Sequence, residues 1–69
     1  MQKLSYIFSK NLKKYRTTAN LSQEELAFRS GLHRTYISAV ERNLRNISIN
    51  NIEKIANALN IKASQLLEE

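Results

Sequence analysis

The stretch LSQEELAFRSGLHRTYISAVERNLRN, residues 21–46, decides the fold of this chain. Ser22 is followed three residues later by Glu25, a capping box that predicts a helix beginning at Gln23. Gly31 is the single glycine of the chain and lies where a left-handed residue would end that helix. The first half of the stretch therefore predicts a short helix and a tight turn.

A second helix is expected from about Arg34 to Arg42, with Ile37 and Val40 facing inward and polar residues at its exposed start. Two short helices joined by a turn of three or four residues form the helix-turn-helix pattern, here spanning about residues 22–43. This pattern predicts that the chain reads double-stranded DNA.

The remaining sequence predicts three further helices. The first runs from about Lys3 to Thr18, and the fourth begins after Ser48 as an N-cap. The last is short, roughly Ala63 to Glu68. Core positions are expected at helical spacing, namely Leu4, Phe8, Leu12, Tyr15, Leu26, Ala27, Ile52, Ile55, Ala56, Leu59 and Leu66. Three asparagines replace glycine as left-handed residues at helix ends, namely Asn20, Asn43 and Asn60.

Composition agrees with one compact all-α domain of five helices over residues 1–69. The chain has 69 residues, 42% of them hydrophobic, with no proline and no cysteine. Its length is near the lower limit for a domain that folds on its own core. The lack of cysteine fits a reducing cytoplasm, and no apolar run approaches the roughly 18 residues that span a bilayer. We expect a cytoplasmic protein with no membrane partner.

Charge is unevenly distributed. Residues 1–46 hold nine Lys/Arg against three Glu, whereas residues 47–69 hold two Lys against three Glu. The basic part indicates a polyanion partner, although a solvated basic surface is the alternative. The near-neutral tail, residues 47–69, is expected to mediate dimerisation.

The chain resembles the Cro/phage-repressor (Xre-type) helix-turn-helix family. The resemblance rests on LSQEELA (21–27), GL (31–32), YISAVER (36–42) and NIEKIANALNI (51–61). The string HRTYISAVERNLRN, residues 33–46, is most similar to the controller proteins of restriction–modification systems. This resemblance implies a five-helix fold, a homodimer on a pseudo-palindromic operator, and regulation of the protein's own promoter and of the endonuclease gene. RNA polymerase is a further partner that such a regulator can contact.

Base contacts are expected from the start of the second helix of the motif, because that end faces the base edges. Arg34 is the first candidate, since a guanidinium can form two hydrogen bonds with guanine. Thr35 offers a methyl and a hydroxyl, with local backbone hydrogen bonding as the alternative. Ser38 is small enough for close approach. The resemblance places Tyr36 on the DNA side, with packing on its own helix as the alternative.

Backbone phosphates are expected to contact residues on either side of this helix. Gln23 lies at the start of the preceding helix, where free N–H groups attract anions. His33 occupies the N-cap position, where relatives carry better capping residues. The end of the second helix of the motif and the loop after it are rich in hydrogen-bond donors. They supply the remaining candidates, Arg42, Asn43, Arg45 and Asn46.

Structural and interface roles are implied mainly by the resemblance. Glu41 is expected to form a buried ion pair with Arg16. The candidate dimer interface consists of apolar residues that the core does not obviously need, namely Ile49, Ile61, Ala63 and Leu67.

Other functions remain as alternatives. A phage-type repressor or an antitoxin would also bind DNA, whereas a basic helical adaptor would bind only protein. An enzyme is not expected, because the sequence offers no nucleophile–base pair or carboxylate dyad and contains no Asp. With one His and no Cys, no metal, cofactor or small-molecule ligand is expected.

Overall fold

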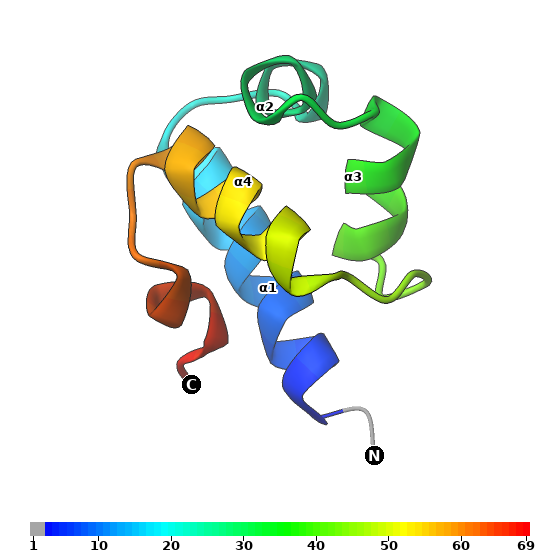
Figure 1. The fold of residues 1–69 in the computed structure, drawn as a ribbon, viewed down its shortest axis with the longest axis vertical. Coiled ribbons are helices and arrows are strands. Elements are labelled where there is room, and N and C mark those ends of the chain that lie inside the picture. Colours follow the sequence, from blue (N-terminus) through cyan, green and yellow to red (C-terminus); the bar gives the residue numbers. More distant parts are fainter. Residues whose placement is uncertain (1–2) are drawn as a thin grey trace.

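The computed structural model describes residues 3–69 as four α-helices followed by a short 3-10 helix (Figure 1). The elements are α1 (Lys3–Thr18), α2 (Gln23–Ser30), α3 (Arg34–Glu41), α4 (Ile49–Leu59) and η1 (Ala63–Leu67). No helix within residues 3–69 has the length and apolarity needed to cross a membrane.

The predicted start of α2 is confirmed. Ser22 Oγ accepts a hydrogen bond from the Glu25 N–H at 2.9 Å, and the Ser22 N–H donates to Glu25 Oε1 at 2.8 Å. These bonds, the one from the Ser22 backbone above all, lower the pKa of the exposed Glu25 carboxyl, and the charge of Arg29 assists. The reciprocal cap therefore satisfies two backbone N–H donors at the helix entry.

Left-handed residues end the helices at the predicted places. Gly31 has φ 75°, and Asn20, Asn43 and Asn60 have φ 61°, 59° and 58°. A Cβ added at Gly31 would meet no atom within 4 Å, so the backbone angle and not space favours glycine there. The asparagines tolerate the same conformation, as expected.

The prediction of a fifth α-helix is wrong in type. Residues Ala63–Leu67 form a 3-10 helix, and Glu68 is already extended with φ −89° and ψ 140°. Five residues provide too few i to i−4 hydrogen bonds to offset the cost of starting an α-helix, so the tighter i to i−3 pattern results. The Lys62 N–H donates to Gln65 Oε1 at 3.0 Å and fixes the first turn of η1.

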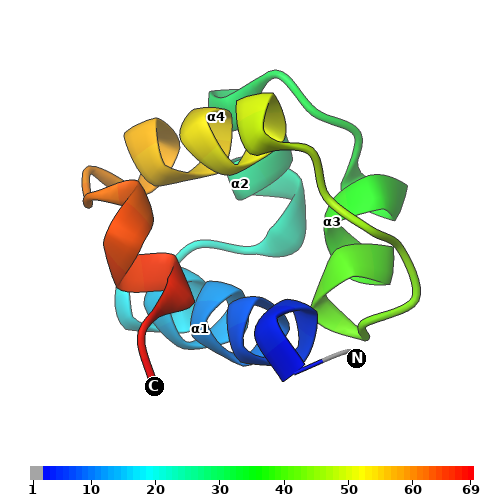
Figure 2. The same ribbon diagram turned by 60° about the horizontal axis from the view of Figure 1, so that its bottom comes forward.

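The helices surround one apolar core. α1 and α4 lie on opposite sides of the molecule, α3 closes one side between them, and η1 closes the other (Figure 2). The most deeply buried side chains come from all five elements, namely Phe8, Leu12, Leu26, Ile37, Val40, Ile55 and Leu66. Each element therefore contributes to the core that holds α3 in place.

The prediction that Leu4 belongs to the core is wrong. Leu4 is 57% exposed, whereas Phe8 and Leu12 on the same face of α1 are buried. The first turn of α1 extends beyond the ends of the neighbouring helices (Figure 1), and the apolar face is only partly covered there. Helical spacing identifies a face of a helix but not how far along it the neighbours reach.

Two polar side chains of α1 tie the outer elements to it. Ser9 is buried, and its Oγ lies 2.7 Å from the carbonyl oxygen of Val40 at the end of α3. Asn11 Nδ2 donates to the carbonyl oxygens of Leu66 at 2.9 Å and Glu68 at 2.7 Å. These bonds fix the end of α3 and the C-terminal segment, and neither was predicted from the sequence.

Candidate nucleic-acid interface

The exposed start of α3 and the start of α2 form one hollowed surface. A shallow depression between them is lined by Gln23, Arg34, Thr35, Ser38 and Arg42. All five are residues for which the sequence predicts DNA contacts. Because the first turns of two helices meet here, unpaired backbone N–H groups add to the positive character of this surface.

Arg34 and Thr35 are exposed at the first turn of α3, and Ser38 follows one turn later, partly exposed. The preceding residue, His33, is extended with φ −84° and ψ 147°, and its side chain makes no capping hydrogen bond. Arg34 is thus a cation at the positive end of a helix, which stability alone does not favour. An anionic ligand would offset this.

A compact ion pair lies behind the depression. Arg16 Nε and Nη2 donate to Glu41 Oε2 and Oε1 at 2.6 Å and 3.1 Å, and the side chains are 11% and 3% exposed. Arg16 Nη1 also donates to the carbonyl oxygen of Leu21 at 2.7 Å, which joins α1 to the chain before α2. Gln23 Nε2 donates to Glu41 Oε1 at 3.0 Å. The pair therefore links α1, α2 and α3.

The bond from Gln23 to Glu41 was missed by sequence reasoning. Gln23 was interpreted only as a phosphate contact, yet one of its amide hydrogens is used internally. Its second amide hydrogen and its carbonyl oxygen remain for other partners. No sequence signal reports this contact, because the two residues are 18 positions apart.

The loop after α3 carries the remaining predicted phosphate contacts. Arg42 caps α3, and Asn43 turns the chain with its left-handed backbone, its N–H donating to the carbonyl oxygen of Val40 at 2.9 Å. Arg45 and Asn46 are exposed. Arg42 lines the depression, whereas Arg45 and Asn46 lie outside it, so these donors lie on more than one part of the surface.

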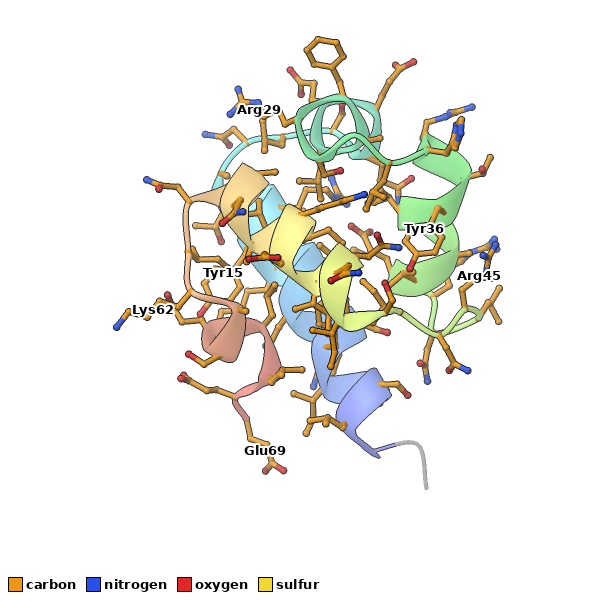
Figure 3. All side chains as sticks on the ribbon, in the orientation of Figure 1. Tyr15, Arg29, Tyr36, Arg45, Lys62 and Glu69 are labelled. Carbon is orange, nitrogen blue, oxygen red and sulfur yellow. The ribbon has the colours of Figure 1, made fainter. Side chains whose placement is uncertain are left out.

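Tyr36 belongs to α3, and its side chain reaches the start of α4. Its side chain is half-buried and packs against the core. Its hydroxyl accepts a hydrogen bond from Asn51 Nδ2 at 3.1 Å, and the Arg45 guanidinium lies 5.1 Å from the centre of its ring. Figure 3 shows Tyr36 and Arg45 on the same side of the molecule, at α3 and the loop that follows it. Asn51 was not among the predicted site residues.

The candidate dimer residues differ in exposure. Ile49 is 84% exposed at the start of α4, and Ala63 is exposed at the start of η1. Ile61 and Leu67, by contrast, are partly buried and pack against the core. The expectation that the core does not need Ile61 and Leu67 is therefore wrong. η1 contacts both α1 and α4, and this places Leu67 against the core.

The described residues hold no cluster of three or more His, Cys, Asp or Glu side chains that could bind a metal ion. Every buried side-chain nitrogen or oxygen in this part of the chain has a hydrogen-bond partner.

Comparison with known proteins identifies the family. The helix-turn-helix family pattern matches residues 12–66, which include α2, α3 and α4. The chain belongs to the helix-turn-helix family. Control protein C.BamHI of Bacillus amyloliquefaciens is 48% identical over 63 residues, covering 90% of this chain and 78% of that protein.

Solved structures give the same result. The restriction–modification controller protein C.AhdI from Aeromonas hydrophila is similar with a TM-score of 0.87 and 48% identity, over 90% of this chain and 94% of the other. The biofilm regulator SinR, solved in complex with DNA, is similar with a TM-score of 0.84 and 35% identity, over 88% and 98% of the two chains. These relatives are a control protein, a restriction–modification controller and a master regulator.

Proposed function

We propose that this protein is a sequence-specific DNA-binding transcription regulator that acts as a homodimer on a pseudo-palindromic operator. The observation that carries the proposal is the depression lined by Gln23, Arg34, Thr35, Ser38 and Arg42. These side chains combine hydrogen-bond donors and acceptors with two cations on one surface that runs along a short helix. Such a helix fits the major groove, which is about 12 Å wide.

The roles within the interface follow from position and chemistry. Arg34 reads a guanine through two hydrogen bonds, and Thr35 and Ser38 approach neighbouring base edges. Phosphates on both sides of the groove are contacted by Gln23, His33, Arg42, Asn43, Arg45 and Asn46. Tyr36 contributes to the DNA-facing surface through its ring and hydroxyl. Glu41 stays within the ion pair and does not meet the DNA.

Dimerisation would double a small set of base contacts, because two copies one helical turn apart, about 34 Å, read two half-sites. Ile49 and Ala63 are the exposed apolar residues that support an interface in residues 47–69. Ile61 and Leu67 would contribute their remaining exposed surface. The exposed apolar surface of this candidate interface is small, so we expect a dimer that dissociates on dilution.

The regulated system is inferred from the relatives. C.BamHI and C.AhdI are control proteins, the latter described as a restriction–modification controller, and both match this chain at 48% identity. We infer that this protein controls a restriction–modification system and its own promoter. A phage-type repressor or antitoxin would share the DNA interface and would differ in the genes alongside.

The proposal is tested by fluorescence anisotropy with DNA from just upstream of the protein's own gene and with scrambled DNA, at several salt concentrations. We expect a preference of about a thousandfold, a steep salt dependence and two chains per site. Equal weak binding to both sequences would contradict sequence-specific autoregulation. An absence of binding at low salt would favour a protein-binding adaptor instead.

A further inference from the structure

The recognition helix α3 and the first turn of α4 are joined through Tyr36. Asn51 Nδ2 donates to the Tyr36 hydroxyl at 3.1 Å, a side-chain hydrogen bond between two different helices. The Tyr36 hydroxyl in turn donates to the carbonyl oxygen of Asn46 over a longer distance, 3.5 Å between the two oxygens. The phenol is thus in contact with both α4 and the loop between the helices.

Asn51 is itself held in place. The Ser48 side chain accepts a hydrogen bond from the Asn51 N–H at 3.1 Å and caps α4. The Asn51 side chain is partly buried, whereas its neighbour Asn50 is exposed. Its amide therefore starts from a rigid helix turn, which favours a defined direction for the bond to Tyr36.

Arg45 is the residue whose position depends on this arrangement. It is exposed in a stretch of irregular backbone between α3 and α4, and its guanidinium lies 5.1 Å from the centre of the Tyr36 ring. A free arginine loses considerable side-chain entropy when it binds. A guanidinium already held over an aromatic face has lost part of that freedom beforehand.

We propose that Asn51 is a positioning residue for DNA recognition: it fixes the Tyr36 hydroxyl, and the Tyr36 ring in turn holds Arg45 ready to contact the DNA beside α3. This inference rests on the proposed function, because Arg45 needs a DNA partner to matter. It also connects α4, the helix of the candidate dimer surface, with the recognition surface. Asn51 acts through Tyr36 and Arg45 and does not itself touch DNA.

The test is a double-mutant cycle on operator affinity with Asn51→Ala and Arg45→Ala, singly and together. Asn51→Ala should weaken binding about three- to tenfold, the range of one lost hydrogen bond. The same change made in the Arg45→Ala protein should have no further effect. Asn50→Ala is the matched control, the same change one position earlier in the same helical turn, and should leave affinity unchanged.

A second measurement needs no DNA. The ring current of Tyr36 should shift the side-chain proton resonances of Arg45 in the NMR spectrum of the free protein. We expect that shift to shrink in Asn51→Ala and to persist in Asn50→Ala, with the melting temperature changed little, because alanine favours the helix.

The outcomes separate the two proposals. If the wild-type protein binds its operator and Asn51→Ala matches Asn50→Ala, the inference is overturned while the proposed function stands. An equal loss with and without Arg45 would also overturn it, since Asn51 would then act merely by supporting α4. If the wild-type protein shows no operator preference, the proposed function fails and the inference fails with it.

Discussion

The recognition half of the molecule, residues 22–46, and the C-terminal half, residues 47–69, are held in place by different interactions. In the first, the Arg16–Glu41 pair and Gln23 form a largely buried polar junction behind an exposed surface rich in donors. In the second, apolar side chains such as Ile55 and Leu66 do most of the packing, and Asn11 bonds to the backbone.

This difference has a physical reason. A surface that meets a polyanion must keep cations and amides free, so only the inner face of α3, with Ile37 and Val40, is available for apolar packing. A directional ion pair that links three helices adds rigidity to this packing. The C-terminal half has no such requirement and can rely on hydrophobic burial. The following predictions test whether the two halves really depend on different interactions.

The largest effect is expected for Glu41→Ala. It leaves the Arg16 guanidinium, only 11% exposed, without its partner, and it removes the acceptor of Gln23. Breaking such a pair costs about 3–5 kcal/mol of unfolding free energy, enough to unfold much of a small domain. Thermal unfolding followed by circular dichroism measures this, with the exposed Glu53→Ala as control. A reduced DNA affinity at an unchanged melting temperature would contradict a structural role.

Arg34→Ala should have the opposite effect, a loss of DNA affinity without a loss of stability. Losing a two-bond contact with guanine should cost about 1–3 kcal/mol of binding free energy, or roughly tenfold to a hundredfold in affinity. The melting temperature should not fall, because a cation is removed from the positive end of α3. Anisotropy on operator and scrambled DNA measures the loss, and equal weakening on both would indicate a phosphate contact and not base reading.

Ile49→Asp tests the C-terminal half. Ile49 is 84% exposed, so the substitution should leave the fold intact while placing a charge on the proposed dimer surface. The dimer dissociation constant should rise about tenfold or more, as expected for the loss of one buried aliphatic side chain per subunit. Sedimentation velocity over a range of concentrations measures it. Ala58→Asp is unsuitable as a control because Ala58 packs against the core, so Asn57→Asp, exposed on the same helix, serves instead.

Ser22→Ala should have a smaller effect on the recognition half. It removes the side-chain oxygen that accepts from the Glu25 N–H, and N-cap losses of this kind cost about 1 kcal/mol. Chemical denaturation measures the change in unfolding free energy. The corresponding cap of α4, tested with Ser48→Ala, should cost a similar amount, because Ser48 also accepts from a backbone N–H at 3.1 Å.

The smallest effect is a pH dependence from Glu25. Its pKa is lowered in the folded protein by its hydrogen bonds to Ser22, so the folded state favours the ionised form. The stabilisation is fully present above the unfolded pKa, about 4.3, and is lost as pH falls through the lower folded value. Glu25→Gln should therefore differ from wild type at neutral pH and approach it near pH 3. A constant difference in melting temperature across this range would contradict the assignment.

Much of the fold could be predicted from local signals. The capping box of Ser22 and Glu25, the glycine at position 31 and the left-handed asparagines act within one helical turn, so the sequence alone carries them. The starts of α2, α3 and α4 were predicted for this reason. The resemblance to known regulators added the pairing of Arg16 with Glu41, a contact across 25 positions that local rules do not encode.

Other features depended on which helices meet in space. The sequence by itself determined the helix-turn-helix motif, the order and starts of the helices, and the set of polar residues offered at the start of α3. Only the tertiary structure decided that Leu4 stays largely exposed, that Ile61 and Leu67 pack against the core, and that Asn51 reaches Tyr36. Caps and turns are fixed by bonds between residues close in the chain. The burial of a side chain and its contacts with distant residues depend instead on how separate helices pack and on where each of them ends.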